Sequence, residues 1–454
     1  MPHNPAAALA QAAAQTDWVG LPELIRRRAE MLLRDTIAVI AGGVAHPSYV
    51  PIVSAHLRSS QGPCTVLGQP AGVAAVTAAT LNGGATTVLQ LQDGHRVARG
   101  HPASHAVPVL LALAEESGAG TQQFLTSLVA GYEVAARVGM SLGGMHEALH
   151  DAGTWATIGA AAAGAHFLSR ANPEIIAHAI EGASSVALFP YRHSSVRGAS
   201  IHHLYIGLGA AAGLNTAMGV QAGLRSVPGT LESFFGPRAG HKFDAALLTH
   251  GLDARGNWST YEILNGYVKW HPVCGHHTSA MDAMTRVMTH DGVNANNVTA
   301  VDVATYRAAL DYNVAHPAND LAARFSVPAA MASILVGGNA YRTNIEFEDQ
   351  RIQALMARVN VRHDPALDAD YPSARPARVS VTLADGRTIS ETVMTPYGDG
   401  AHALSDADFS RKTQALLTTR FGVNGAAKVS AALDDYIAGG PIAQLSAALR
   451  QPSI

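Results

Sequence analysis

Acidic, basic and imidazole side chains gather in the stretch LQDGHRVARGHPASHAVP (residues 91–108), just before the apolar, helix-like run VLLALAEE. Two prolines bracket the start of that helix, so His101 and His105 lie in or near its first turn. The partial positive charge of a helix start favours a neutral imidazole, which can act as a base, and attracts anions such as carboxylates. We therefore expect His101 or a second histidine, His150, to be the catalytic acid or base, Asp93 to be a catalytic partner, and His95 and His105 to bind substrate. The alternative is that these groups only cap the helix and hold the loop.

Two further groups of polar residues lie at the boundaries of expected helices. His150 precedes a helix of small residues, TWATIGAAAAG, whose tight packing would hold its start rigidly, and we predict a catalytic role for it. The stretch FPYRHSSVRGASIHHLYIG offers arginines suited to bidentate carboxylate binding. Its predicted substrate-binding residues are Tyr191, Arg192, Arg197 and His202. A capping histidine and a solvated loop are the respective alternatives.

A fourth group lies in NGYVKWHPVCGHHTSAMDAM. Lys269 follows an apolar, strand-like run and is a further catalytic candidate. Cys274, His276 and His277 crowd the start of the next helix and are predicted to bind substrate. A Cys-Gly-His-His run does not have the ligand spacing of a zinc site, so we predict no metal here.

Several standard catalytic signatures are absent from the sequence. It contains no GxGxxG after a strand, no GxxxxGK[ST], no HExxH, no GxSxG and no CxxC pair. The residues therefore offer neither a nucleotide-binding loop nor a recognisable nucleophile turn.

The elements that must position these groups fall into two types. From about Leu21 to about Met218 the apolar periodicity is helical almost throughout. After about Asn257, β-branched runs appear, and Asp385-Gly386 between two of them is a strong hairpin signal. We predict a mainly α fold: a helical-bundle domain (1–257), an inserted α+β lid domain (258–398) and C-terminal helices that complete the bundle (399–454).

The composition limits the classes of partner. Charged residues make up 14% of the chain, against roughly 25% in ordinary proteins, so we expect a second copy to cover part of the surface; a large monomer is the alternative. A net charge of −3 without blocks of like charge argues against nucleic-acid and membrane partners. We expect a cytoplasmic protein, because two cysteines do not make a disulfide framework and the sequence shows neither a secretory signal pattern nor an unbroken apolar span.

Six blocks, in order, make the sequence resemble the MmgE/PrpD family over nearly its whole length. They are GHPASHAVPVLLALAEE, GYEVAARVG, HDAGTWATIGAAAAGAHFL, HHLYIGLGAAAGLNTAMG, VKWHPVCGHHTSAMDA and ARFSVPAAMA. The resemblance implies a homodimer of two-domain subunits, with the active site in the cleft between helical bundle and lid and no need for a metal or organic cofactor. It also implies that His101, His150 and Lys269 line that site. Where members that resemble decarboxylases have a lysine before the YIGLG-like segment, this chain has His202, which changes how a carboxylate is gripped.

These observations favour a lyase, of dehydratase or decarboxylase type, that acts on a small di- or tricarboxylate by proton transfer at a carbon next to a carboxylate. Such a carbon is a weak acid, so the site must supply a base and cations for the developing charge. An epimerase that uses two bases on a dicarboxylate is the first alternative. A non-catalytic carboxylate-binding oligomer is the second, and it predicts that the titratable groups do not converge.

Overall fold

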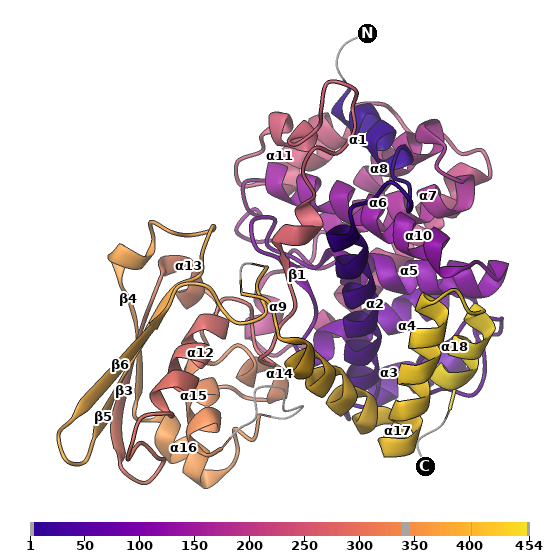
Figure 1. Cartoon of the computed structure of the whole chain (residues 1–454). Helices are drawn as coiled ribbons and strands as arrows, with labels where there is room; N and C mark the ends of the chain where they lie inside the picture. Colours follow the sequence, from indigo (N-terminus) through magenta and orange to yellow (C-terminus); the bar gives the residue numbers. More distant parts are fainter. Residues whose placement is uncertain (1–3, 338–344, 401, 452–454) are drawn as a thin grey trace.

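The computed structural model describes residues 4–337, 345–400 and 402–451, which form a large helical lobe and a smaller α+β lobe (Figure 1). The helices of the large lobe are α1 (Pro5–Ala14), α2 (Glu23–Val44), α3 (Val50–Leu57), α4 (Ala75–Val88), α5 (Pro102–Ser117), α6 (Thr121–Ser141), α7 (Trp155–Ser169), α8 (Pro173–Val186), α9 (His193–Val196), α10 (Tyr205–Gln221), α11 (Gly236–Ala239), α17 (Asp406–Ile437) and α18 (Ile442–Leu449). The predicted mainly helical fold with a smaller α+β part is confirmed.

Small residues allow the central helices of the large lobe to pack closely. A Cβ atom on Gly131 of α6 would collide with Ala163 of α7, and one on Gly159 of α7 would collide with Ala135 of α6. The two helices therefore approach more closely than larger side chains permit. This contact holds the start of α7, and with it the loop that carries His150, in one place.

The smaller lobe is built on a four-stranded sheet with the order β4-β3-β5-β6. Its elements are α12 (Thr278–Val287), β3 (Val298–Thr305), α13 (Arg307–Leu310), α14 (Asp320–Ala323), α15 (Val327–Leu335), α16 (Gln350–Met356), β4 (Val359–His363), β5 (Ala377–Leu383) and β6 (Thr388–Val393). β3 runs parallel to β4 and antiparallel to β5, and β5 and β6 form the predicted hairpin. Alternate residues of β5 are buried, because one face of the sheet packs on helices such as α12. Gly386 has a φ of +87° in the hairpin turn, which explains the glycine.

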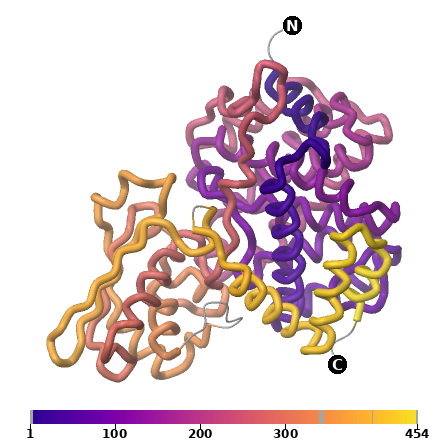
Figure 2. Tube along the Cα trace, viewed as in Figure 1, coloured from indigo at the N-terminus to yellow at the C-terminus, as the bar shows by residue number. Residues whose placement is uncertain are grey.

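The chain passes between the lobes twice. It leaves the helical lobe through β2 (Gly266–Tyr267), which pairs antiparallel with β1 (Gly94–His95), and then enters α12. It returns after β6 through α17, which lies against α2 (Figure 2). The domain boundaries at 258 and 398 remain a prediction.

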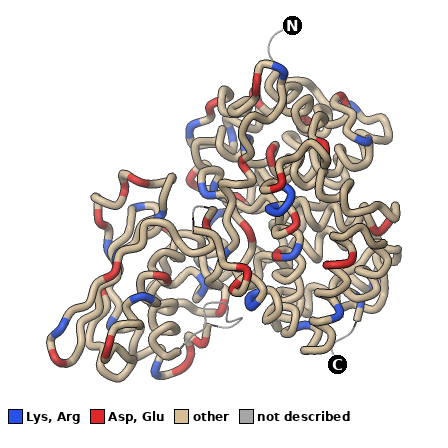
Figure 3. Tube along the Cα trace, in the orientation of Figure 1, with Lys and Arg blue, Asp and Glu red and all other residues tan. Residues whose placement is uncertain are grey.

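Figure 3 shows positively and negatively charged residues in both lobes. None of the helices in the described ranges is long and apolar enough to cross a bilayer.

Candidate functional site

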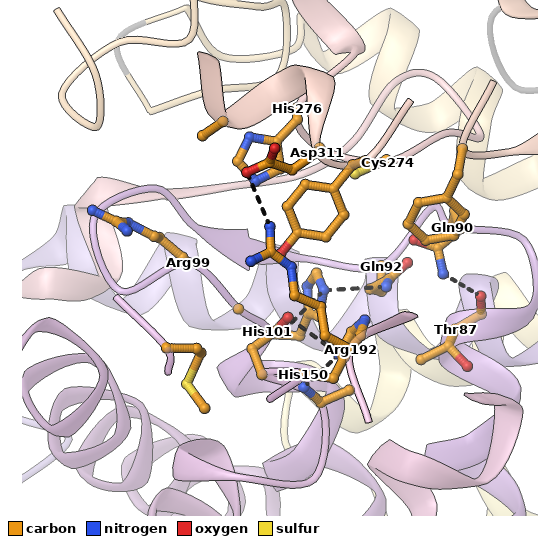
Figure 4. Close-up of a pocket in the computed structure, with 18 of the residues that line it drawn as sticks. Thr87, Gln90, Gln92, Arg99, His101, His150, Arg192, Cys274, His276 and Asp311 are labelled. Carbon is orange, nitrogen blue, oxygen red and sulfur yellow. Dashed lines mark hydrogen bonds and ion pairs between the residues drawn. The ribbon is translucent and has the colours of Figure 1, made fainter. Parts of the chain in front are cut away.

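A cavity of about 290 Å³ lies between the lobes and brings together residues from both (Figure 4). The helical lobe contributes, among others, Gln90, Gln92, His101, His150, Asp151 and His202. The opposite wall includes Lys269, Cys274, His276, Tyr312, Tyr371 and Arg375. Three of the predicted catalytic residues, His101, His150 and Lys269, therefore line the same small cavity.

His101 is the residue immediately before α5, and its hydrogen bonds fix its tautomer. Its Nδ1 lies 2.5 Å from the carbonyl oxygen of Asp93. A carbonyl only accepts, so Nδ1 carries the proton and Nε2 keeps its lone pair. Gln92 donates to this Nε2 at 3.3 Å, and burial lowers the pKa of His101 to about 3. His101 is thus a neutral imidazole whose acceptor nitrogen lies among cavity residues.

Asp93 occupies a different place from the one predicted. Its carboxylate accepts hydrogen bonds from the backbone N–H groups of Ala103 and Ser104, each at 2.9 Å, and from the Ser104 hydroxyl at 2.6 Å. It therefore caps the start of α5, it is buried, and it does not line the cavity. Burial raises its pKa to about 6. Asp93 positions His101 through its carbonyl group, and its carboxylate is occupied by the helix.

His105 and His95 also lie outside the cavity lining. His105 donates from Nδ1 to the carbonyl of His101 at 2.7 Å, and its Nε2 accepts from the backbone N–H of Gly153 at 3.0 Å. Both ring nitrogens are used, and the residue ties α5 to the loop before α7. His95 is buried and donates to the carboxylate of Glu262 at 3.2 Å. Neither histidine lies where the predicted substrate-binding role would require it, in the lining of the cavity. Both instead hold in place the loops that carry the cavity residues.

His150 has the opposite tautomer to His101. Its Nδ1 accepts the backbone N–H of Ala152 at 3.0 Å, so Nε2 carries the proton. Asp151 lies between the two rings: one carboxylate oxygen is 3.3 Å from Nδ1 of His150 and the other is 3.7 Å from Nε2 of His101. Burial lowers the pKa of His150. One imidazole is therefore an acceptor and the other a donor, with a carboxylate placed to stabilise a proton gained by His101.

His202 is an uncharged member of the same wall. Gln90 donates from its amide nitrogen to the carbonyl of Thr87 at 2.9 Å and to Nε2 of His202 at 3.2 Å. The ring of His202 lies 4.8 Å from that of His150. Burial holds the pKa of His202 well below its usual range, so the ring is neutral. At this position the wall offers hydrogen bonding without a positive charge.

Lys269 is buried on the opposite wall. Its ammonium group is 3.5 Å from the amide oxygen of Gln92, whose amide nitrogen contacts His101. Burial lowers the pKa of Lys269 to about 8. Cys274 also lines this wall, and burial raises the pKa of its thiol, which favours the uncharged form.

Three cavity arginines each lie over a tyrosine ring. The pairs are Arg99 over Tyr371 at 4.8 Å, Arg192 over Tyr312 at 4.5 Å, and Arg375 over Tyr267 at 5.3 Å. Arg192 also reaches from the helical side to within 3.7 Å of the Asp311 carboxylate (Figure 4). These cations line a cavity of suitable size for a small anion.

Of the remaining predicted residues, His276 lines the cavity, whereas His277, Tyr191 and Arg197 do not. His276 lines the cavity, where it stacks on Tyr312 at 4.7 Å. His277 is buried outside the lining, with Nε2 3.4 Å from a backbone carbonyl. Tyr191 and Arg197 are exposed on the helical lobe and do not line the cavity.

Several cavity residues did not emerge from the sequence. Gln90 and Gln92 lie within three residues before Asp93, and Asp151 directly follows His150. Their closeness in sequence to predicted residues is a signal that could have found them. Tyr371 and Arg375 had no local signal, because only the folding of the smaller lobe brings them to the cavity. Across residues 4–337, 345–400 and 402–451, no three His, Cys, Asp or Glu side chains are grouped so that they could hold a metal ion.

Comparison with known proteins gives consistent matches. The family model of the MmgE/PrpD N-terminal domain matches residues 7–240, and that of the MmgE/PrpD C-terminal domain matches residues 271–435. A cis-aconitate decarboxylase of Aspergillus terreus is 24% identical over 413 residues, which is 83% of this chain and 82% of that protein. The cis-aconitate decarboxylase-like protein oryM of Aspergillus oryzae is 32% identical over 136 residues, 27% of each chain.

Proposed function

Because the chain belongs to the MmgE/PrpD family, we propose that it is a lyase of dehydratase or decarboxylase type that acts on a small di- or tricarboxylate without a cofactor. The observation that carries the proposal is the pair of opposite tautomers in one cavity: Nε2 of His101 is unprotonated, and Nε2 of His150 carries a proton. The similarity to a cis-aconitate decarboxylase over most of the chain supports the same reaction class.

The proposed step is proton transfer at a carbon next to a carboxylate. His101 exchanges a proton with this carbon through Nε2, and the nearby carboxylate of Asp151 stabilises the imidazolium while His101 holds the proton. His150 donates from its protonated Nε2 to an oxygen on which charge develops or to a leaving group.

Cations on the far side of the cavity hold the substrate in this proposal. Lys269 and Arg375 lie on the wall opposite the histidines, and Arg192 lies at the contact between the lobes. A carboxylate bound to them places the adjacent carbon toward His101, and their charge also stabilises an enolate-like state. The position of His202 adds no cation to the helical wall, which favours a substrate whose carboxylates face the smaller lobe.

The test is proton NMR in D2O with a panel of di- and tricarboxylates. Lyase activity predicts new vinylic signals or the loss of a carboxyl group. No reaction with any member of the panel would overturn the proposal.

An epimerase is the second candidate, because one acceptor and one donor histidine are also what a two-base proton exchange requires. In the same experiment it predicts deuterium at the α-position without net loss of substrate. The convergence of His101, His150 and Lys269 on one cavity argues against a purely carboxylate-binding oligomer, which predicted separated groups.

We also propose that the protein is a homodimer in the reducing cytoplasm. Exposed large apolar side chains concentrate in the segment 186–234, including Val186, Ile201, Leu208, Leu224 and Val227. Such side chains on one segment are typical of a covered surface. Sedimentation equilibrium should give twice the mass of one chain, and Leu208→Lys should shift the protein toward monomer.

A further inference from the structure

A buried ion pair outside the cavity lining joins helix α17 to helix α2. Lys412 of α17 donates to the carboxylate of Asp35 of α2 at 2.6 Å, and both side chains are fully buried. The second carboxylate oxygen of Asp35 has no hydrogen-bond partner among the described residues. A buried pair that is incompletely satisfied adds little to stability compared with apolar residues. Stability alone is therefore a weak reason for this pair.

The same ammonium group has a second contact that points to a role in the site. Lys412 also donates to the backbone carbonyl of Leu91 at 3.2 Å. Leu91 is flanked by Gln90 and Gln92, and Asp93 follows. The lysine thus holds the middle of a loop from which three successive contacts reach the cavity histidines.

Each of these contacts involves a residue of the loop 90–93. The amide of Gln90 donates to His202, and the amide of Gln92 donates to His101. The carbonyl of Asp93 accepts from Nδ1 of His101 and so fixes the tautomer in which Nε2 is unprotonated. A shift of this loop would move the amide and the carbonyl that orient the proposed base.

The backbone of the loop also needs an external anchor. Gln90 has a φ of +53°, in the left-handed region that is unfavourable for a residue with a side chain. Such a conformation is strained and persists when surrounding contacts hold it. The hydrogen bond from Lys412 to the next residue, Leu91, is one such contact.

We propose that Lys412, oriented by Asp35, is a positioning residue that holds the loop 90–93 in the conformation in which His101 acts. The catalytic role of His101 in this proposal rests on the proposed function. The effect of Lys412 on the conformation of the loop 90–93 does not depend on that function. Lys412 does not touch the cavity and acts only through Leu91 and its neighbours.

The main test is the double variant Asp35→Asn/Lys412→Met, which removes both charges together and leaves no unpaired buried ion. The matched control is Arg34→Gln, because Arg34 and Asp434 form a more exposed ion pair between the same two helices. We expect the double variant to fold and to lose at least about tenfold in kcat with KM nearly unchanged, since small misplacements of catalytic groups cost rate. Arg34→Gln should keep the wild-type kcat.

A readout independent of turnover is the downfield proton signal of the short hydrogen bond from His101 Nδ1 to Asp93, assigned by its absence in His101→Gln. We expect the signal to disappear or broaden in the double variant and to persist in Arg34→Gln.

If the double variant folds with kcat and this signal unchanged, the proposal is overturned. If the wild type turns over no carboxylate while the signal still depends on Lys412, the proposed function fails and the positioning role stands. Lys412→Arg, which keeps the charge but moves the donor, gives the same comparison should the double variant not fold.

Discussion

The two walls of the cavity differ in how their polar groups are held. On the helical wall, His101 and His150 each have one ring nitrogen bonded to the backbone, so their tautomers are fixed. On the opposite wall, Lys269 has one long hydrogen bond to an amide, and Arg375 lies over the ring of Tyr267. The first wall carries neutral, hydrogen-bonded imidazoles beside the carboxylate of Asp151, whereas the second carries the cations Lys269 and Arg375.

This difference separates two tasks that the proposed chemistry requires. Proton transfer needs a nitrogen held within a narrow range of positions, which the tightly packed helices α5 and α7 supply. Carboxylate binding needs charge and tolerates some movement, which an ammonium group and guanidinium groups on flexible stems supply. Variants of the two walls should therefore change different kinetic constants.

The largest expected effect is on the helical wall. His101→Gln keeps a polar side chain but removes the base, and kcat should fall by about 10³-fold with little change in KM. Steady-state kinetics on the substrate found by NMR measures this. His178→Gln is the control, since His178 is remote from the cavity and bonds to Ser226. Retention of more than about a tenth of the wild-type kcat in His101→Gln would remove His101 from the proposed role.

On the cationic wall, Lys269→Met should lower kcat/KM by about 10²-fold, because a buried charge that meets a carboxylate is lost. The pKa of Lys269 is lowered to about 8, so its charged form is present below that pH and is lost as pH rises through about 8. Wild-type kcat/KM should therefore fall above about pH 8. Lys269→Arg keeps its charge, so its residual activity should not show this decline. A decline at the same pH in Lys269→Arg would assign the titration to another group.

Asp151 tests whether the proton on His101 is stabilised by its neighbour. Asp151→Asn removes the carboxylate that favours the imidazolium, so kcat should fall by about tenfold. The effect should be smaller than that of His101→Gln, because the base itself remains. Asp253→Asn, on the surface, is the control for loss of one negative charge. An unchanged kcat in Asp151→Asn would show that the carboxylate does not take part.

The sequence indicated the positions of His101 and His150 at helix starts better than it indicated the residues around them. Pro102 and the small-residue run after His150 marked two helix starts, and the structure places helices at both. His95 and His105 hold loops in place and do not line the cavity, but they lie in the same stretch of sequence as the cavity residue His101. Only the three-dimensional partners of each ring nitrogen distinguish them.

The cationic wall was harder to predict for a physical reason. Lys269 and Cys274 lie in one segment, but Arg375 and Tyr371 come from a loop about a hundred residues later. This loop connects β4 to β5, so the sheet β4-β3-β5-β6 determines where it lies. Local periodicity carries no information on such a long-range contact. The fold class depends on local patterns summed over many residues, and it could therefore be predicted.

The smallest expected effect tests the aromatic support that Tyr312 of the cationic wall gives to Arg192, which reaches it from the helical side. Tyr312→Leu removes the ring under Arg192, a cation–π contact of about 1 kcal/mol, so KM should rise by about fivefold while kcat stays near the wild-type value. Tyr312→Phe keeps the ring and should behave like the wild type, which makes it the matched control. A fall in kcat of the same size in Tyr312→Leu would mean that this wall also orients the reacting carbon. The division of tasks between the two walls would then be wrong, because binding and proton transfer would share the same supports.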